Sequence, residues 1–262
     1  MIGGVNVASS QIANIYNQGN NQLSDTLSKI ASGKKFQNAG QDLTSFSRAN
    51  TLSNQISGYN NVEQKLTAAK TATSAAVDVG SKVYENLTKM QDLVTKYGGT
   101  TDVNERAEYT AEFNSLRDTV SKSLTNATVD GTNVADGTYS NTVNMDPQGG
   151  STLAITLATS ADSTNVDGLT INGGSVVADL QTEVDNSLTY MSEAKSFNNI
   201  IDNQISLNKT IVNSKEAVKS LITDIDEATE SSKMIDQNVR QNAAMSMLSQ
   251  ANMSRQAVMK LY

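Results

Sequence analysis

Apolar residues recur every three or four positions along most of this 262-residue chain, which is the spacing of one face of an α-helix. The first such stripe runs from Ile12 to Ile30 and stops at Ser32-Gly33, because glycine is the usual residue just past a helix end. The rest of its surface is Asn, Gln, Ser and Thr, with almost no ion pairs at i,i+4 to support it. We expect a helix that is poorly ordered until it finds a partner; an ordinary bundle helix is the alternative.

The second stripe is the longest and covers residues 46–97 without a proline. As one helix it would be about 80 Å long at 1.5 Å per residue, which indicates a rod. Gly58 and Gly80 are the expected soft points, because glycine is a poor helix former.

A shorter helix is expected at 107–124, after a turn at Gly98-Gly99, and it should fold back on the long helix. Both helices are preceded by side chains that can cap their first N–H groups: Asp42 or Thr44, and Asp102 or Asn104.

The pattern changes between residues 129 and 175, where Asp-Gly and Gly-Gly pairs punctuate the chain. Alternating apolar residues at 153–157 and 169–171 predict short strands, so we expect a small region of β-hairpins. It is too small for a core of its own and should lie on the helices.

Helical spacing resumes at Asp179 and continues to the end, and five of the nine methionines follow residue 230. Methionine re-packs easily, so these side chains are either plain core or an adaptable contact surface. We expect the two terminal helices to bury each other, first within one molecule and then between molecules. The residues predicted to pack there are Ile12, Leu23, Leu27, Ile30, Ile225, Met234, Val239, Met247, Leu248 and Val258.

The predicted fold class is mainly α: an elongated rod of long antiparallel helices, with coiled-coil terminal helices and a small β-hairpin insert. The predicted segments are a terminal helix with its connection (1–43), the first part of a helical rod (44–128), the insert (129–178), the returning rod helix (179–222) and a C-terminal helix (223–262).

Composition excludes several functions. The net charge of −7 and the lack of a basic, aromatic-rich groove argue against nucleic acid. The chain has neither His nor Cys, which removes the commonest zinc ligands and the usual nucleophile pairs, so no catalytic residue, metal or cofactor is expected. No apolar run approaches the ~20 residues of a membrane span. The N-terminus lacks a secretory signal, so the protein either stays inside or leaves by a route that cleaves none.

Three acidic residues near the C-terminal end could suggest chemistry. Asp224 and Asp226 are two positions apart and cannot share a helix face, whereas Asp226 and Glu230 can. We interpret them as caps or solvated charges at a helix junction rather than as metal or acid–base groups.

Three stretches resemble bacterial flagellins. Residues 27–39 read Leu-Ser-Lys-Ile-Ala-Ser-Gly-Lys-Lys-Phe-Gln-Asn-Ala, residues 222–230 read Ile-Thr-Asp-Ile-Asp-Glu-Ala-Thr-Glu, and residues 248–252 read Leu-Ser-Gln-Ala-Asn. The resemblance covers about 20–130 and 180–262 and includes Asp42. Gln41 departs from it, standing where the family usually has Asp, and Phe46 and Arg48 shift the apolar pattern that follows.

The resemblance implies a structural subunit, not an enzyme, that polymerises into the flagellar filament. It implies export in an unfolded state through a flagellar type III apparatus and an extracellular, secreted location. Implied partners are other flagellin subunits, an export chaperone at the C-terminal helix, and filament cap and junction proteins, with no nucleic acid or membrane. The motif positions at the helix junctions are Ser32, Gly33, Asp42, Asp224, Asp226 and Glu230.

One further expectation comes from the resemblance. Many flagellins carry Arg residues that an animal innate immune receptor reads at the positions of Lys89, Gln91 and Leu93. Lys89 and Gln91 replace the two Arg, so recognition by this receptor should be weak.

Rival interpretations of the whole chain are a hook–filament junction protein, a flagellin-like surface protein with an enzymatic insert, and a coiled-coil surface tether.

Overall fold

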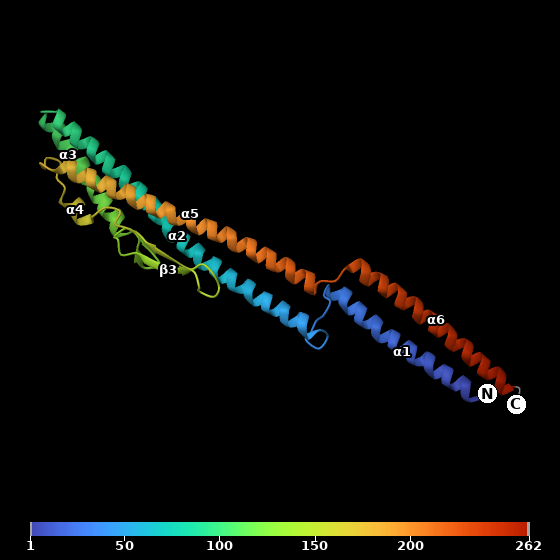
Figure 1. Cartoon of the computed structure of the whole chain (residues 1–262). Coiled ribbons are helices and arrows are strands. Elements are labelled where there is room, and N and C mark those ends of the chain that lie inside the picture. Colours follow the sequence, from blue (N-terminus) through green and yellow to red (C-terminus); the bar gives the residue numbers. More distant parts are fainter. Residues whose placement is uncertain (1, 261–262) are drawn as a thin grey trace. The chain divides into compact units, whose positions relative to one another are not determined.

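The computed structural model describes the backbone of residues 2–260 and the side chains of residues 10–254, 256 and 257. It is mainly helical, with small hairpins, as the periodicity predicted (Figure 1). The helices are α1 (Ile2–Ser32), α2 (Leu43–Gly99), α3 (Val103–Thr125), α4 (Ser163–Gly168), α5 (Val176–Thr223) and α6 (Glu227–Lys260). The strands are β1 (Thr128–Val129), β2 (Thr132–Asn133), β3 (Ser140–Asn144) and β4 (Thr152–Thr156).

The chain forms two compact units. The terminal unit contains the residues up to 54 and those from 215 onward, and the central unit contains residues 55–214. The five segments predicted from sequence use other boundaries, at 43/44, 128/129, 178/179 and 222/223, and that division stays a prediction.

In the terminal unit, α1 and α6 lie side by side and run antiparallel (Figure 1). The side chains turned inward repeat in alternating steps of three and four, which is the spacing of a coiled-coil seam. On α1 these residues are Ile12, Tyr16, Gly19, Leu23, Thr26 and Ile30, and on α6 they are Glu230, Met234, Gln237, Gln241, Ala244, Leu248 and Ala251.

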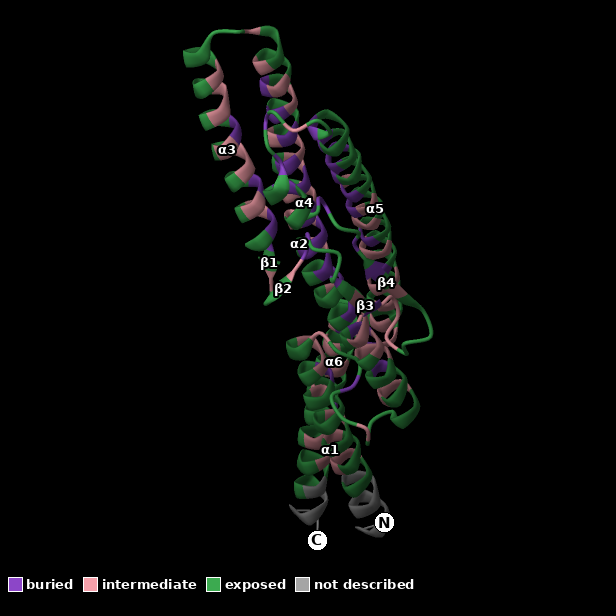
Figure 2. Ribbon diagram, turned by 90° about the vertical axis from the view of Figure 1, so that its left-hand side faces the viewer, coloured by how far each residue is buried: buried purple, intermediate pink, exposed green. Residues whose placement is uncertain are grey.

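In the central unit, α2 and α5 run antiparallel and are joined by polar contacts at intervals. Lys70 pairs with Asp202 at 2.5 Å, and Lys209 pairs with Glu63 at 3.4 Å. Buried apolar residues gather on the facing sides of α2, α3 and α5 (Figure 2). The most completely buried of them include Leu66, Val83, Leu87, Met90, Phe113, Val120, Leu180, Tyr190 and Ile201.

Helix α3 starts at the cap that the sequence predicted. The Asp102 carboxylate accepts hydrogen bonds from the N–H groups of Asn104 and Glu105, at 2.7 and 3.3 Å. The guanidinium of Arg106 lies 4.9 Å from the centre of the Tyr97 ring, so the start of α3 is held against the end of α2.

The insert forms two antiparallel hairpins, β1–β2 and β3–β4. Asp130 and Gly131 make the first turn with positive φ angles of 50° and 79°, as two-residue hairpins require. The inward side chains of the second hairpin, Val143 and Ile155, are buried with the helical core, as predicted for a region too small to fold alone.

One predicted strand is wrong. Residues 169–171 form no strand; they follow the short helix α4 and continue into turns before α5. Leu169 and Ile171 are nevertheless buried in the core, so their apolar character reflected burial rather than strand pairing.

The glycines predicted to be soft points in α2 are sites of close packing. A Cβ on Gly58 would lie 2.8 Å from Pro147 Cβ, and one on Gly80 would lie 2.6 Å from Met191 Cγ. Both glycines therefore let another part of the central unit approach the helix.

Among the described residues, no helix is both long enough and apolar enough to cross a membrane.

Candidate functional site

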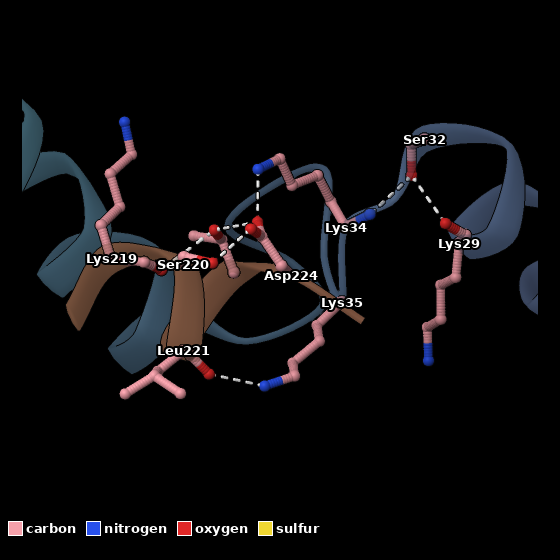
Figure 3. Close-up of polar contacts among 9 residues, drawn as sticks. Lys29, Ser32, Lys34, Lys35, Lys219, Ser220, Leu221 and Asp224 are labelled. Carbon is pink, nitrogen blue, oxygen red and sulfur yellow. Dashed lines mark hydrogen bonds and ion pairs between the residues drawn. The ribbon is translucent and has the colours of Figure 1, made fainter. Parts of the chain in front are cut away.

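The connection after α1 is tied to the break between α5 and α6 by a short antiparallel bridge (Figure 3). The Lys35 N–H donates to the Thr223 carbonyl at 2.7 Å, and the Ile225 N–H donates to the Gly33 carbonyl at 3.1 Å. The Lys35 ammonium donates to the Leu221 carbonyl at 2.7 Å, which satisfies one of the last carbonyls of α5. Two backbone bonds thus hold together residues that are 188 and 192 positions apart in the chain.

Asp224 is the polar centre of this bridge. Its carboxylate accepts bonds from Lys34 Nζ at 2.5 Å and Ser220 Oγ at 2.6 Å (Figure 3). It also accepts a bond from Thr223 Oγ1 at 2.7 Å. These bonds, above all the one from Lys34, hold the pKa of Asp224 well below its usual range. Sequence reasoning singled out Asp224 but missed its partner Lys34, although both lie within the quoted motifs.

The helix boundaries around the bridge follow from the other motif residues. Gly33 has a positive φ of 68°, which ends α1, and Ser32 Oγ donates to the Ser28 carbonyl at 2.8 Å. Asp42 begins α2 by accepting the Ser45 N–H at 3.0 Å, and its pKa is lowered chiefly by the bonds from Ser45.

Asp226 begins α6. Its carboxylate accepts the N–H groups of Ala228 and Thr229, at 3.1 and 3.3 Å, and its pKa is lowered chiefly by the Thr229 hydroxyl bond. Glu230, one turn later, is only 8% exposed and lies 3.1 Å from Lys233 Nζ. Asp224 and Asp226 both lie in the break before α6. Asp224 bonds to Lys34 in the bridge, and Asp226 caps the start of α6.

Phe46, one of the departures from the resemblance, contributes to the packing of the connection. Its ring makes an edge-to-face contact with the buried ring of Phe36, with the ring centres 6.3 Å apart. Arg48 is exposed.

The ten residues predicted to pack at the terminal helices divide into three groups. Ile12, Leu23, Ile30, Ile225, Met234 and Leu248 are half-buried. Leu27, Val239 and Met247 are exposed and do not lie between α1 and α6. The side chain of Val258 is outside the described residues.

One exposed member, Val239, belongs to a second apolar surface on α6, which we call the outer face. On α6, Ile235 and Val239 are 60% and 61% exposed and, with Met253, lie roughly opposite the seam to α1. Met245 and Met247 on α6, and Ile15 and Leu27 on α1, are also exposed, at other positions around their helices. Unpartnered apolar side chains in such number mark a contact surface.

The three residues at the predicted receptor region differ in accessibility. Lys89 is exposed, whereas Gln91 donates to Gln181 Oε1 at 3.2 Å. Leu93 is only 3% exposed and belongs to the central core.

Within residues 2–260, no cluster of three or more acidic side chains is arranged to hold a metal ion.

Comparison with known proteins identifies two family regions in the chain. The bacterial flagellin N-terminal helical region matches residues 5–140, and the bacterial flagellin C-terminal helical region matches residues 176–262. The flagellin FljO of Caulobacter vibrioides is 24% identical over 257 residues, covering 94% of this chain and 93% of that protein. A flagellin of Halalkalibacterium halodurans is 24% identical over 255 residues, covering 92% of each.

Among solved structures, a chain described as a candidate flagellar hook-associated protein from Vibrio parahaemolyticus aligns with a TM-score of 0.43 and 15% identity. The alignment covers 79% of this chain and all of that one. The two family regions together span both terminal helices and the central helices, and the chain belongs to the bacterial flagellin family, the structural subunits of the flagellar filament.

Proposed function

We propose that this subunit is secreted unfolded and that its terminal helices become ordered as it joins the end of a growing filament. The observation that carries the proposal is that α6 has two contact faces, of which α1 covers one. The outer face, with Ile235 and Val239 in its centre, has no cover within the described part of the subunit.

The energetics support ordering by neighbours. Fixing a residue costs about 1–2 kcal/mol in backbone entropy, and burying a Val or Ile side chain regains about 1.5–3 kcal/mol. Helices α1 and α6 contain 31 and 34 residues, and few large apolar side chains lie in their shared seam. Burial of the outer face against adjacent subunits adds the missing gain.

One repeated contact of this kind does not close on itself, so it builds a helical polymer. Before assembly, the same face of α6 offers an export chaperone an apolar helix face to bind. The filament cap and the junction proteins are the partners expected at the two ends of the polymer. The absence of cysteine suits a chain that must be threaded, since a disulfide would block it.

Seeded polymerisation tests the outer face. Val239→Asn should raise the subunit concentration needed for growth on sheared filament ends by about tenfold, because burial of Val239 is lost. Val239→Ile, which keeps an apolar branched side chain, should grow like the wild type. Unchanged growth of the Asn variant would overturn the proposal.

Abundance separates a filament subunit from a junction protein. Mass spectrometry of sheared filaments should find this chain in many copies along the filament. Confinement to a few copies between hook and filament would favour the junction role instead.

We also expect weak recognition by the innate immune receptor that reads flagellins. Lysine and glutamine cannot make the bidentate contacts of two arginines, and the side chain of Gln91 is already bonded to Gln181. In a receptor reporter assay, Lys89→Arg/Gln91→Arg should respond more strongly than the native subunit. A full response to the native subunit would contradict this expectation.

A further inference from the structure

The seam by which α6 contacts α1 is made mostly of polar and small side chains. Of its seven positions on α6, three carry Glu or Gln and two carry Ala, and only Met234 and Leu248 are large and apolar. A stable coiled coil places branched apolar residues at these positions, because each one fills a hole in the facing helix. The periodicity of α6 is therefore that of a coiled coil, while its chemistry is not.

The polar side chains are engaged at the centre of the pair. Gln241 Nε2 donates to Asn20 Oδ1 at 2.6 Å, and its Cγ lies 3.5 Å from where a Cβ on Gly19 would be. Glycine at that position lets the two helices come close enough for the bond. Among the described residues, the buried Gln237 Oε1 has no hydrogen-bond partner, which makes its burial costly.

Buried polar groups in a helix seam have two effects. They favour the alignment in which they can bond, and they lower the stability of the pair. The Gln241–Asn20 bond, although exposed, likewise favours one alignment of the two helices. Thr26 on α1 is also buried in this seam, but the other α1 positions are mostly large and apolar, so the low apolar content of the seam comes chiefly from α6.

We propose that Gln237 and Gln241 set the stability of the α1–α6 pair, and keep it low enough that the two helices separate in the free subunit. The proposal deepens the proposed function, since it names the residues that leave ordering to assembly. Its test uses the free subunit alone, so it can fail without affecting the role of the outer face.

The experiment measures amide hydrogen exchange along the full-length free subunit. Gln237→Leu/Gln241→Leu should slow exchange in both α1 and α6 by about tenfold or more, because the seam gains two buried apolar side chains. The matched control is Gln250→Leu, which makes the same chemical change at an exposed position of α6 and should leave exchange in α1 unchanged.

Amides of the central unit serve as an internal standard and should exchange alike in all variants. If the Leu variant aggregates, Gln237→Met/Gln241→Met, which keeps the side chains unbranched, should slow exchange in the same two helices. Unchanged exchange in α1 and α6, or equal slowing by Gln250→Leu, would overturn the proposal.

Discussion

Single side chains decide how the terminal unit is held at its junction, and Asp224 is the clearest case. Its carboxylate receives bonds from Lys34, Ser220 and Thr223, and Lys34 comes from the connection after α1. The carboxylate is partly exposed, so its contribution is screened by water and local to the bridge.

The lowered pKa of Asp224 predicts a sensitivity to acid. A carboxyl group whose pKa is lower in the folded state contributes fully above its unfolded value of about 3.9, and the contribution is lost as the pH falls below that. The protection factors of the Lys35 and Ile225 amides should therefore be constant near neutral pH and begin to fall once the pH drops below about 4.

The variant Asp224→Asn isolates this effect. Both amides should be less protected at neutral pH, with little further loss in acid, because the charge-assisted bond from Lys34 is gone. Exchange measured by NMR at several pH values provides the comparison. A variant that loses as much protection in acid as the wild type would show that other groups cause the acid sensitivity.

Gly80 shows a second dependence on one residue, in the central unit. A Cβ there would lie 2.6 Å from Met191 Cγ and 2.9 Å from Tyr190 Cδ1. The Tyr190 ring cannot easily move away, because it is fully buried and its hydroxyl donates to the Val134 carbonyl at 2.7 Å. Burial also raises the pKa of Tyr190, so the hydroxyl stays protonated as a donor.

Gly80→Ala should consequently lower the free energy of unfolding of the central unit by roughly 1–3 kcal/mol, as overpacking does. The gain of up to about 1 kcal/mol in helix propensity offsets part of the loss. Gly98→Ala is the control in the same helix, because nothing lies within 4 Å of the added Cβ. Urea denaturation in which both variants behave alike would contradict the close packing at Gly80.

At the scale of elements, the starts of helices are set by short polar side chains that accept hydrogen bonds from the first N–H groups. Asp102→Ala should lower the free energy of unfolding of the central unit by about 1 kcal/mol, because α3 loses the acceptor for Asn104 and Glu105. Asp102→Ser should restore most of it. Thermal unfolding gives the comparison, and equal stability of the Ala and Ser variants would exclude a capping role.

The long helices and their caps were predictable because their signals are local. Apolar residues at steps of three and four, with Asp42 and Asp102 at the starts, specify α2 and α3 without knowledge of any partner. The turn at Asp130-Gly131 was equally local, since few residues other than glycine accept its backbone angles.

Other features depend on contacts between distant residues. Gly80 looked like a weak point in a helix, and only the position of Tyr190 and Met191, more than a hundred residues away, explains it. The short apolar alternation at 169–171 resembled a strand because burial alone can produce that pattern.

The candidate site was only partly predictable for a similar reason. A search for apolar periodicity finds Val239 and Met247 but passes over Gln237 and Gln241, although the latter pair lies in the seam. On α6, the seam is mostly polar or small and the outer face is apolar. A helix pair that is stable in a monomer would show the reverse arrangement, with its apolar side facing inward.

At the scale of the whole molecule, the central unit and the terminal unit differ in what stabilises them. The central unit holds an extensive buried core that needs no neighbour. In the terminal unit, the α6 side of the seam is mostly polar or small and apolar residues lie on the exposed side of α6, which suits helices that fold against other subunits. This division fits the proposed export of an unfolded chain whose terminal helices become ordered in the filament.

The most direct measurement is amide hydrogen exchange of α1 and α6 in the free subunit and in the assembled filament, with the central unit as reference. Exchange in both terminal helices should be fast in the free subunit and slow in the filament, while the amides of the central core exchange slowly in both. Terminal helices that are as well protected in the free subunit as in the filament would contradict ordering by assembly.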